Sequence, residues 1–129
     1  MIVSVGVDLI EVERVRRALE DAKIGQRFRD RVYTGKEIEY CEGKERGKYE
    51  SYAGRFAAKE AVMKALGRGW GSKVSWLDIE ALPFPGGKPE LYLHNKTAVL
   101  AQQLGIHHWS LSITHTERYA VAYVIAQGE

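Results

Sequence analysis

Apolar residues alternate with small or polar residues along the stretch IVSVGVDLI, residues 2–10. Positions 3, 5, 7 and 9 are valine or leucine, whereas Ser4, Gly6 and Asp8 occupy the even positions between them. A period of two residues is typical of a β-strand, whose successive side chains point to opposite sides. In the next segment, 11–22, the apolar residues recur every three or four positions. The pattern therefore predicts a strand that leads into an amphipathic helix.

A second, longer helical pattern occupies AGRFAAKEAVMKALG, residues 53–67. At the α-helical period of about 100° per residue, apolar side chains occur on nearly all sides, which indicates a helix covered by other parts of the fold. Three charges interrupt it. Glu60 and Lys64 lie side by side, about 40° apart around the helix axis, and Lys59 lies on the other side of Phe56.

Two interpretations of Glu60 and Lys64 remain open from the helix alone. An exposed ion pair four residues apart would stabilise the helix by only about 0.2–0.5 kcal/mol. Alternatively, the carboxylate and the ammonium face a cleft, where they could bind a metal ion and an anionic substrate.

The remaining segments alternate between helices and pairs of strands. TGKE, residues 34–37, fits a capping box that opens a short helix through Glu42, and the polar run 42–50 is predicted to be a loop. Later segments are described by their expected structure: a helical or irregular piece (25–33), a strand pair (74–82 and 89–94) joined by a Gly86-Gly87 turn, a helix (96–105) and a closing hairpin (107–115 and 118–127). This order predicts an α+β fold.

Length and composition suit a soluble globular protein. The chain has 129 residues, of which 45% are hydrophobic and 28% charged, so we expect a single domain spanning residues 1–129. There is no apolar run near the roughly 20 residues that span a bilayer, and the N-terminus lacks the charge order of a secretory signal. Cys41 is the only cysteine, which favours the reducing cytoplasm. A net charge of +2 gives little support for nucleic acid binding.

Asp8 is an unusual residue near the end of an apolar strand. A structural interpretation is that it caps the following helix, with Glu11 as a partner three residues later. A functional interpretation is that it binds a metal ion together with Glu60. Two carboxylates are about what Mg²⁺ uses when phosphate oxygens and water complete its coordination.

The segment SLSITH, residues 110–115, places hydroxyl groups on one face of a predicted strand. Ser110, Ser112 and Thr114 alternate with apolar residues, and His115 ends the strand. Such a face is ordinarily solvated, although hydroxyls beside an imidazole can also bind phosphate oxygens. The glycine loop GRGWGSK, residues 67–73, neither follows a predicted strand nor opens a helix, so it does not match a nucleotide-binding loop.

Four motifs in this order resemble one enzyme family. They are VGVDLIEVER (5–14), GRFAAKEAVMKALG (54–67), GGKP (86–89) and SITHTERYA (112–120). Together they resemble the short bacterial type of 4′-phosphopantetheinyl transferase, the holo-acyl-carrier-protein synthases. The resemblance extends over essentially the whole chain. It implies an α+β domain in which an antiparallel sheet packs on a long central helix.

The resemblance also implies an activity and its residues. These enzymes transfer phosphopantetheine from coenzyme A to a serine of apo-acyl carrier protein, in support of fatty acid biosynthesis. Asp8 and Glu60 would hold Mg²⁺ on the coenzyme A diphosphate, and Lys64 would stabilise or protonate the leaving phosphate. Either Glu60 or a metal-bound water would take the serine proton. Ile10 stands where long-type members have a third acidic residue, so we expect a water there.

The resemblance further assigns substrate and partner surfaces. Residues expected to bind coenzyme A are Gly87, Pro89, Ser112, Thr114 and His115. Residues expected to bind the acidic carrier protein are Arg14, Arg17, Arg27 and Phe28, with Arg31 nearby, whereas Arg16 and Arg29 are interpreted as solvated arginines. The resemblance also implies a homotrimer with active sites between subunits.

Two other functions remain compatible with these patterns. One is a non-catalytic protein that binds an acidic partner through the arginine-rich helix of residues 11–22. The other is a Mg²⁺-dependent nucleotide hydrolase that uses the same carboxylates with water as the nucleophile.

Overall fold

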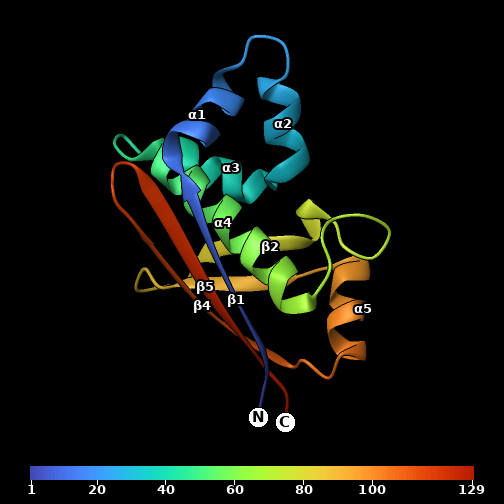
Figure 1. Cartoon of the computed structure of the whole chain (residues 1–129). Helices are drawn as coiled ribbons and strands as arrows, with labels where there is room; N and C mark the ends of the chain where they lie inside the picture. The colour runs from blue at the N-terminus through green and yellow to red at the C-terminus, as the bar shows by residue number, and fades with distance from the viewer.

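Helix α4, Lys48–Leu66, is the centre of the fold. The computed structural model describes residues 1–129 and places α4 across one face of a three-stranded antiparallel sheet (Figure 1). The strand order is β1 (Ile2–Glu11), β5 (Tyr119–Gln127) and β4 (His108–His115). Small residues dominate the buried surface of α4, which lets the sheet approach closely. The predicted α+β fold, with a sheet packed on a long central helix, is confirmed.

Strand β1 turns its small residues, not its valines, toward α4. A Cβ atom added to Gly6 would lie 1.9 Å from the carbonyl oxygen of Ala61, so only glycine permits this approach. The Ser4 hydroxyl donates a hydrogen bond to the Ala65 carbonyl. Asp8 shares this inner face. The valine and leucine side chains at positions 3, 5, 7 and 9 therefore point away from the core and are 42–61% exposed.

Three short helices pack around the first half of α4. They are α1 (Val12–Glu20), α2 (Gly25–Val32) and α3 (Gly35–Glu42), and their apolar residues form a core cluster with Tyr52 and Ala53 of α4 (Figure 1). The predicted capping box opens α3. The Thr34 side chain accepts a hydrogen bond from the Glu37 amide, while the Glu37 side chain accepts one from the Thr34 amide.

A two-stranded antiparallel sheet and a last helix lie beside the C-terminal half of α4. The sheet contains β2 (Ile79–Pro83) and β3 (Pro89–Leu93), and α5 spans Asn95–Gln103 (Figure 1). The predicted strand 74–82 is wrong in its first half, where Trp76–Asp78 form a 3₁₀ turn. Within this turn the Asp78 amide donates to the Ser75 carbonyl, and the Asp78 carboxylate is fixed by hydrogen bonds from Asn95 and Thr97.

The predicted start of the long helix is also wrong. The helix begins at Lys48 rather than at residue 53, after Gly47 in the left-handed conformation (φ 75°). Its polar first turns are held by side-chain contacts: the Tyr49 hydroxyl donates to Glu20 and the Tyr52 hydroxyl to Glu42. A polar sequence that hydrophobic periodicity assigns to a loop is therefore helical here. None of the helices combines the length and the apolar character needed to cross a bilayer.

Candidate active site

A cavity of about 350 Å³ opens where β1, α1, α2 and α4 meet. Its polar members are Asp8 on β1, Arg14 on α1 and Glu60 on α4. Its apolar lining consists of Leu9, Ile10, Val15, Ala18, Phe28 and Phe56. The structure thus brings together residues from the first and the fourth helix and from the N-terminal strand, as the metal-site hypothesis requires.

Asp8 reaches this cavity because it follows Gly6 on the inner face of β1. Its carboxylate Oδ1 lies 3.0 Å from Lys64 Nζ, which also donates to the Val7 carbonyl at 3.0 Å. The Asp8 side chain is 15% exposed and that of Lys64 is 55% exposed. Helix α1 begins at Val12 after Glu11, without a side-chain cap. The interpretation of Asp8 as a helix cap is therefore wrong.

Glu60 forms no ion pair with Lys64, so the simple exposed-pair interpretation is also wrong. Partial burial raises the pKa of the Glu60 carboxyl above its ordinary value, and the negative charge of Asp8 raises it further; the Lys64 ammonium opposes both effects. Two carboxylates thus share one partly desolvated space with a single ammonium. A divalent cation would relieve their repulsion.

The two carboxylates, Asp8 and Glu60, fit a magnesium ion whose remaining ligands come from the substrate and water. Nowhere in the chain do three or more histidine, cysteine, aspartate or glutamate side chains gather as metal ligands. Asp8 and Glu60 alone would leave most of an octahedron to substrate oxygens and water, the arrangement that Mg²⁺ adopts with phosphate ligands. Ile10 lines the cavity as an apolar neighbour and offers no third ligand.

Lys59, adjacent to Glu60 in the chain, has a different environment. Its side chain and that of Glu37 are both 0% exposed and form an ion pair of 2.8 Å. The Lys59 ammonium also donates to the carbonyls of Trp76 and Ile79. Burial lowers the pKa of Lys59, and the Glu37 carboxylate opposes that shift. Lys59 therefore joins α4 to α3 and β2 and does not reach the cavity.

The residues predicted to bind the carrier protein lie on and beside the rim of the cavity. Arg14 and Phe28 line it, and the Phe28 ring stacks on Phe56 with a centroid distance of 6.2 Å. Arg17 and Arg27 are exposed on α1 and α2. Phe56 is a lining residue that sequence analysis missed, although its place on the same helical stripe as Glu60 was the available signal.

The five residues predicted to bind coenzyme A lie elsewhere on the chain. In the sheet, Ser112 pairs with Tyr123, which pairs with Val7, so these residues share the outer face, opposite to Asp8. Thr114 has the same orientation, and His115 ends β4. Pro89 and Ser112 line a second cavity of about 360 Å³, and Gly87 lies in the β2–β3 turn at φ 91°. Within a single chain, these five residues therefore do not lie beside Glu60.

Comparison with known proteins identifies the family. The model of the 4′-phosphopantetheinyl transferase superfamily matches residues 4–124. The chain belongs to this superfamily. A holo-[acyl-carrier-protein] synthase from Solibacter usitatus (strain Ellin6076) is 49% identical over 98% of this chain and 99% of that protein. One from Koribacter versatilis (strain Ellin345) is 46% identical, with the same coverage.

Solved structures of these transferases share the fold. The holo-[acyl-carrier-protein] synthase of Neisseria meningitidis has a TM-score of 0.87 at 32% identity, covering 98% of this chain and 99% of that chain. The Bacillus anthracis enzyme, solved in complex with CoA (3′,5′-ADP), has a TM-score of 0.81 at 38% identity, covering 100% and 99%. The resemblance drawn from the four motifs is thus confirmed over the full chain.

Proposed function

We propose that this chain transfers the 4′-phosphopantetheine group of coenzyme A to a serine of apo-acyl carrier protein and releases adenosine 3′,5′-bisphosphate. The observation that carries this proposal is the meeting of Asp8 and Glu60 at one cavity lined also by Arg14 and Phe28, with the Lys64 ammonium paired to Asp8 beside it. The names of the relatives support the same reaction. As a cytoplasmic enzyme it would supply holo-carrier protein for fatty acid biosynthesis.

The reaction is a displacement at phosphorus. The serine oxygen forms a bond to the phosphorus that carries the pantetheine arm, and the bond from that phosphorus to the oxygen of the adenosine 5′-phosphate breaks. The leaving oxygen keeps the electron pair. Glu60 accepts the serine proton, either directly or through a water beside it. The Lys64 ammonium neutralises charge that develops on the leaving phosphate.

Asp8 and Glu60 would hold Mg²⁺ against the diphosphate. When bound, the ion supplies charge neutralisation and orients the phosphate oxygens. The chain itself contributes the two carboxylates, the nearby Lys64 and an apolar wall that includes Phe56. This wall limits the access of water, which would otherwise compete with the serine as nucleophile.

The carrier protein would dock on α1 and α2. Arg14, Arg17 and Arg27 supply positive charge for an acidic partner, and Phe28 supplies an apolar anchor beside the cavity. Docking there would bring the carrier serine to the mouth of the cavity that contains Glu60.

We infer a homotrimer in which neighbouring subunits complete each site. The outer face of the three-stranded sheet exposes an apolar row that includes Val5, Val7 and Tyr123, and exposed apolar patches of this kind mark interfaces. Ser112 and Thr114 lie on the same face. Association through this face would bury the apolar row and bring these hydroxyls, with His115 and the Gly87–Pro89 turn, to the diphosphate site of the next subunit.

One assay separates this function from its rivals. The chain is incubated with coenzyme A, Mg²⁺ and apo-acyl carrier protein, and the carrier is weighed by mass spectrometry. The proposal predicts a gain of one phosphopantetheine group that requires all three components. Cleavage of coenzyme A without carrier would indicate a hydrolase, and carrier binding without modification would indicate a non-catalytic partner.

The assembly has its own test. Light scattering should give three times the mass of one chain, and Val7→Asp should yield monomers because a carboxylate cannot be buried unpaired at the interface. The monomers should retain their fold and lose transfer activity. A fully active monomer would refute a site shared between subunits.

A further inference from the structure

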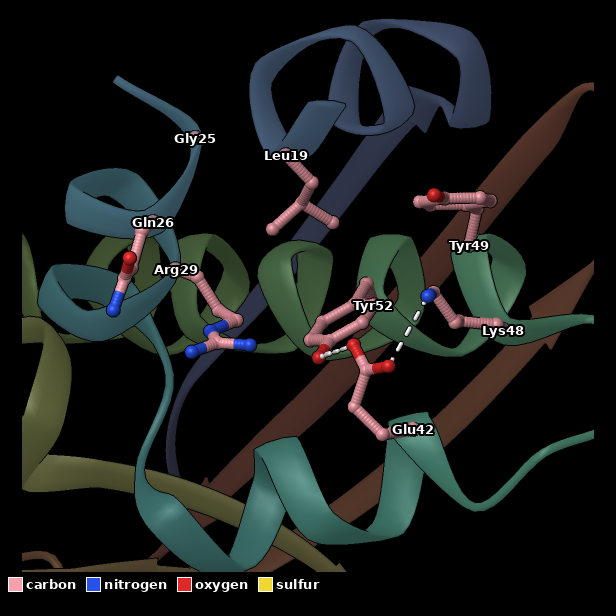
Figure 2. A pocket seen from close by; sticks show the side chains of 8 residues that line it. All are labelled: Leu19, Gly25, Gln26, Arg29, Glu42, Lys48, Tyr49 and Tyr52. Atoms are coloured by element: carbon pink, nitrogen blue, oxygen red, sulfur yellow. Dashed lines mark hydrogen bonds and ion pairs between the residues drawn. The ribbon is translucent and has the colours of Figure 1, made fainter. Parts of the chain in front are cut away.

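A third cavity, polar and of about 380 Å³, lies at the N-terminal end of α4 (Figure 2). It is enclosed by the end of α1, the first turns of α2, the end of α3 and the first turns of α4. Its charged and hydrogen-bonding members include Arg29, Glu42, Lys48 and Tyr52. None of these residues has a role in the proposed transfer.

Glu42 is already satisfied within this cavity. Its Oε2 accepts a hydrogen bond of 2.6 Å from the Tyr52 hydroxyl, and its Oε1 accepts one of 3.1 Å from Lys48 Nζ. Figure 2 shows the carboxylate held between these two donors. Both oxygens of Glu42 are therefore occupied.

Arg29 is not satisfied in the same way. Its only ion pair is a 3.4 Å contact from Nε to the neighbouring Asp30, and its terminal nitrogens donate no hydrogen bond within the chain. The side chain is only 34% exposed, and Figure 2 shows the guanidinium directed into the cavity toward Glu42 and Tyr52. A planar guanidinium presents two parallel donors that match a carboxylate. Two further carboxylates lie just outside the lining, since Asp30 contacts the Arg29 Nε and Glu20 accepts from Tyr49. The terminal nitrogens of Arg29 remain free to bind an additional negative charge.

The position of the cavity indicates the source of that charge. Helices α1, α2 and α4 line both this cavity and the one that contains Glu60. Eight residues separate Tyr52 from Glu60 along α4, a rise of about 12 Å. A protein interface of standard size covers about 800 Å² on each partner, equivalent to a disc of roughly 16 Å radius. A carrier protein docked over α1 and α2 therefore reaches Arg29 as well.

We propose that this cavity binds a carboxylate side chain of the acidic carrier protein, held by the terminal nitrogens of Arg29. The proposal rests on the proposed function and adds a docking contact to it. It replaces the interpretation of Arg29 as a solvated arginine with a binding role. Arg16, the other arginine interpreted in this way, does bind carboxylates of its own helix, Glu13 and Glu20.

The test compares steady-state kinetics of Arg29→Ala, Arg29→Lys and the wild-type chain with apo-carrier protein. Arg29→Ala should raise the KM for carrier about tenfold, the loss expected for a hydrogen bond between charged groups. The KM for coenzyme A and kcat should stay near the wild-type values. Arg29→Lys should recover only part of the loss, because a single ammonium does not replace the fork.

Lys36→Ala is the matched control, because it removes one exposed positive charge on α3 outside this cavity. Its KM for carrier should change much less than that of Arg29→Ala. An unchanged KM for Arg29→Ala, or an equal rise for both variants, would overturn the proposal. A second experiment modifies Arg29 of the wild-type chain with phenylglyoxal in the presence of acetate or of carrier protein. Protection by acetate but not by the carrier would also overturn the proposal, because the cavity would then bind a free anion. A wild-type chain that modifies no carrier would instead overturn the proposed function itself.

Discussion

Lys59 and Glu60 are consecutive residues of α4, yet their charges have opposite surroundings. Lys59 is fully buried, pairs with Glu37 and donates to two backbone carbonyls. Glu60 is half-buried, faces a cavity, and has another carboxylate, Asp8, as its charged neighbour. Every interaction that Lys59 needs is present in the chain. Glu60 has no ion-pair partner, and partial burial together with the Asp8 charge raises its pKa more than the Lys64 ammonium lowers it.

The difference separates a structural charge from a functional one. A buried ion pair with satisfied hydrogen bonds holds elements in register, although it adds little net stability over apolar residues. A pair of carboxylates left in a partly desolvated cavity is unfavourable until a cation or a proton arrives. Such unfavourable pairs are found at active sites. The contrast between Lys59 and Glu60 therefore supports the assignment of the active site to the cavity that Glu60 faces.

The largest expected effect is on the functional side. Glu60→Gln should lower kcat by about 10²–10⁴, the usual contribution of a general base, while the chain remains folded. Transfer to apo-carrier protein, followed by mass spectrometry, measures the effect. Activity within a factor of about three of wild type would remove Glu60 from the chemistry.

The structural side should respond in stability instead. Lys59→Ala should lower the free energy of unfolding by about 3–5 kcal/mol, because it leaves the Glu37 carboxylate buried without a counter-ion. Urea unfolding measures this loss. The double replacement of Lys59→Met with Glu37→Gln should recover only part of it, because it removes the unpaired charge but leaves one of the Thr34 and Ala81 N–H groups without an acceptor. If Lys59→Ala unfolded like wild type but was inactive, the division between the two sides of α4 would be wrong.

Lys64 tests whether the cavity stabilises charge on the leaving group. Lys64→Ala should lower kcat by roughly 10²–10³, as for the loss of one preorganised electrostatic group. Its effect on the free energy of unfolding should stay under about 1 kcal/mol, since the ammonium is largely exposed. Lys64→Arg should restore kcat only in part. A normal kcat for Lys64→Ala would leave the Asp8–Lys64 contact a purely structural one.

The smallest expected effect is a change in stability with pH. Because the pKa of Glu60 is raised in the folded chain, its contribution to stability is fully present below its unfolded pKa of about 4.3 and is lost as pH rises through the folded value. Glu60→Gln should therefore be more stable than wild type at neutral pH, and the difference should vanish in acid. Thermal unfolding at several pH values measures it. A variant less stable than wild type at neutral pH would contradict an uncompensated carboxylate.

Sequence patterns predicted much of this arrangement. Alternation predicted β1, the capping box Thr34–Glu37 predicted the start of α3, and the α+β order was confirmed. The start of α4 was missed because Tyr49 and Tyr52 are fixed by tertiary contacts with Glu20 and Glu42, which local periodicity does not contain.

The candidate site was only partly accessible from the sequence. The helical stripe placed Glu60 beside Lys64, but it could not show that Lys64 would contact Asp8 across 56 positions of the chain. The helical period placed Lys59 on the other side of Phe56, but its buried pairing with Glu37 became visible only in three dimensions. Nor could alternation alone show that β1 turns its small face inward, which depends on the close approach of Gly6 to Ala61.

The most direct test is calorimetry of Mg²⁺ binding with and without coenzyme A. Asp8 and Glu60 supply too few ligands to hold the ion strongly by themselves, so coenzyme A should tighten Mg²⁺ binding by about tenfold or more. Glu60→Gln should abolish that increase while the chain stays folded. Equal Mg²⁺ affinity of the wild-type chain with and without coenzyme A would contradict a metal site completed by the substrate diphosphate.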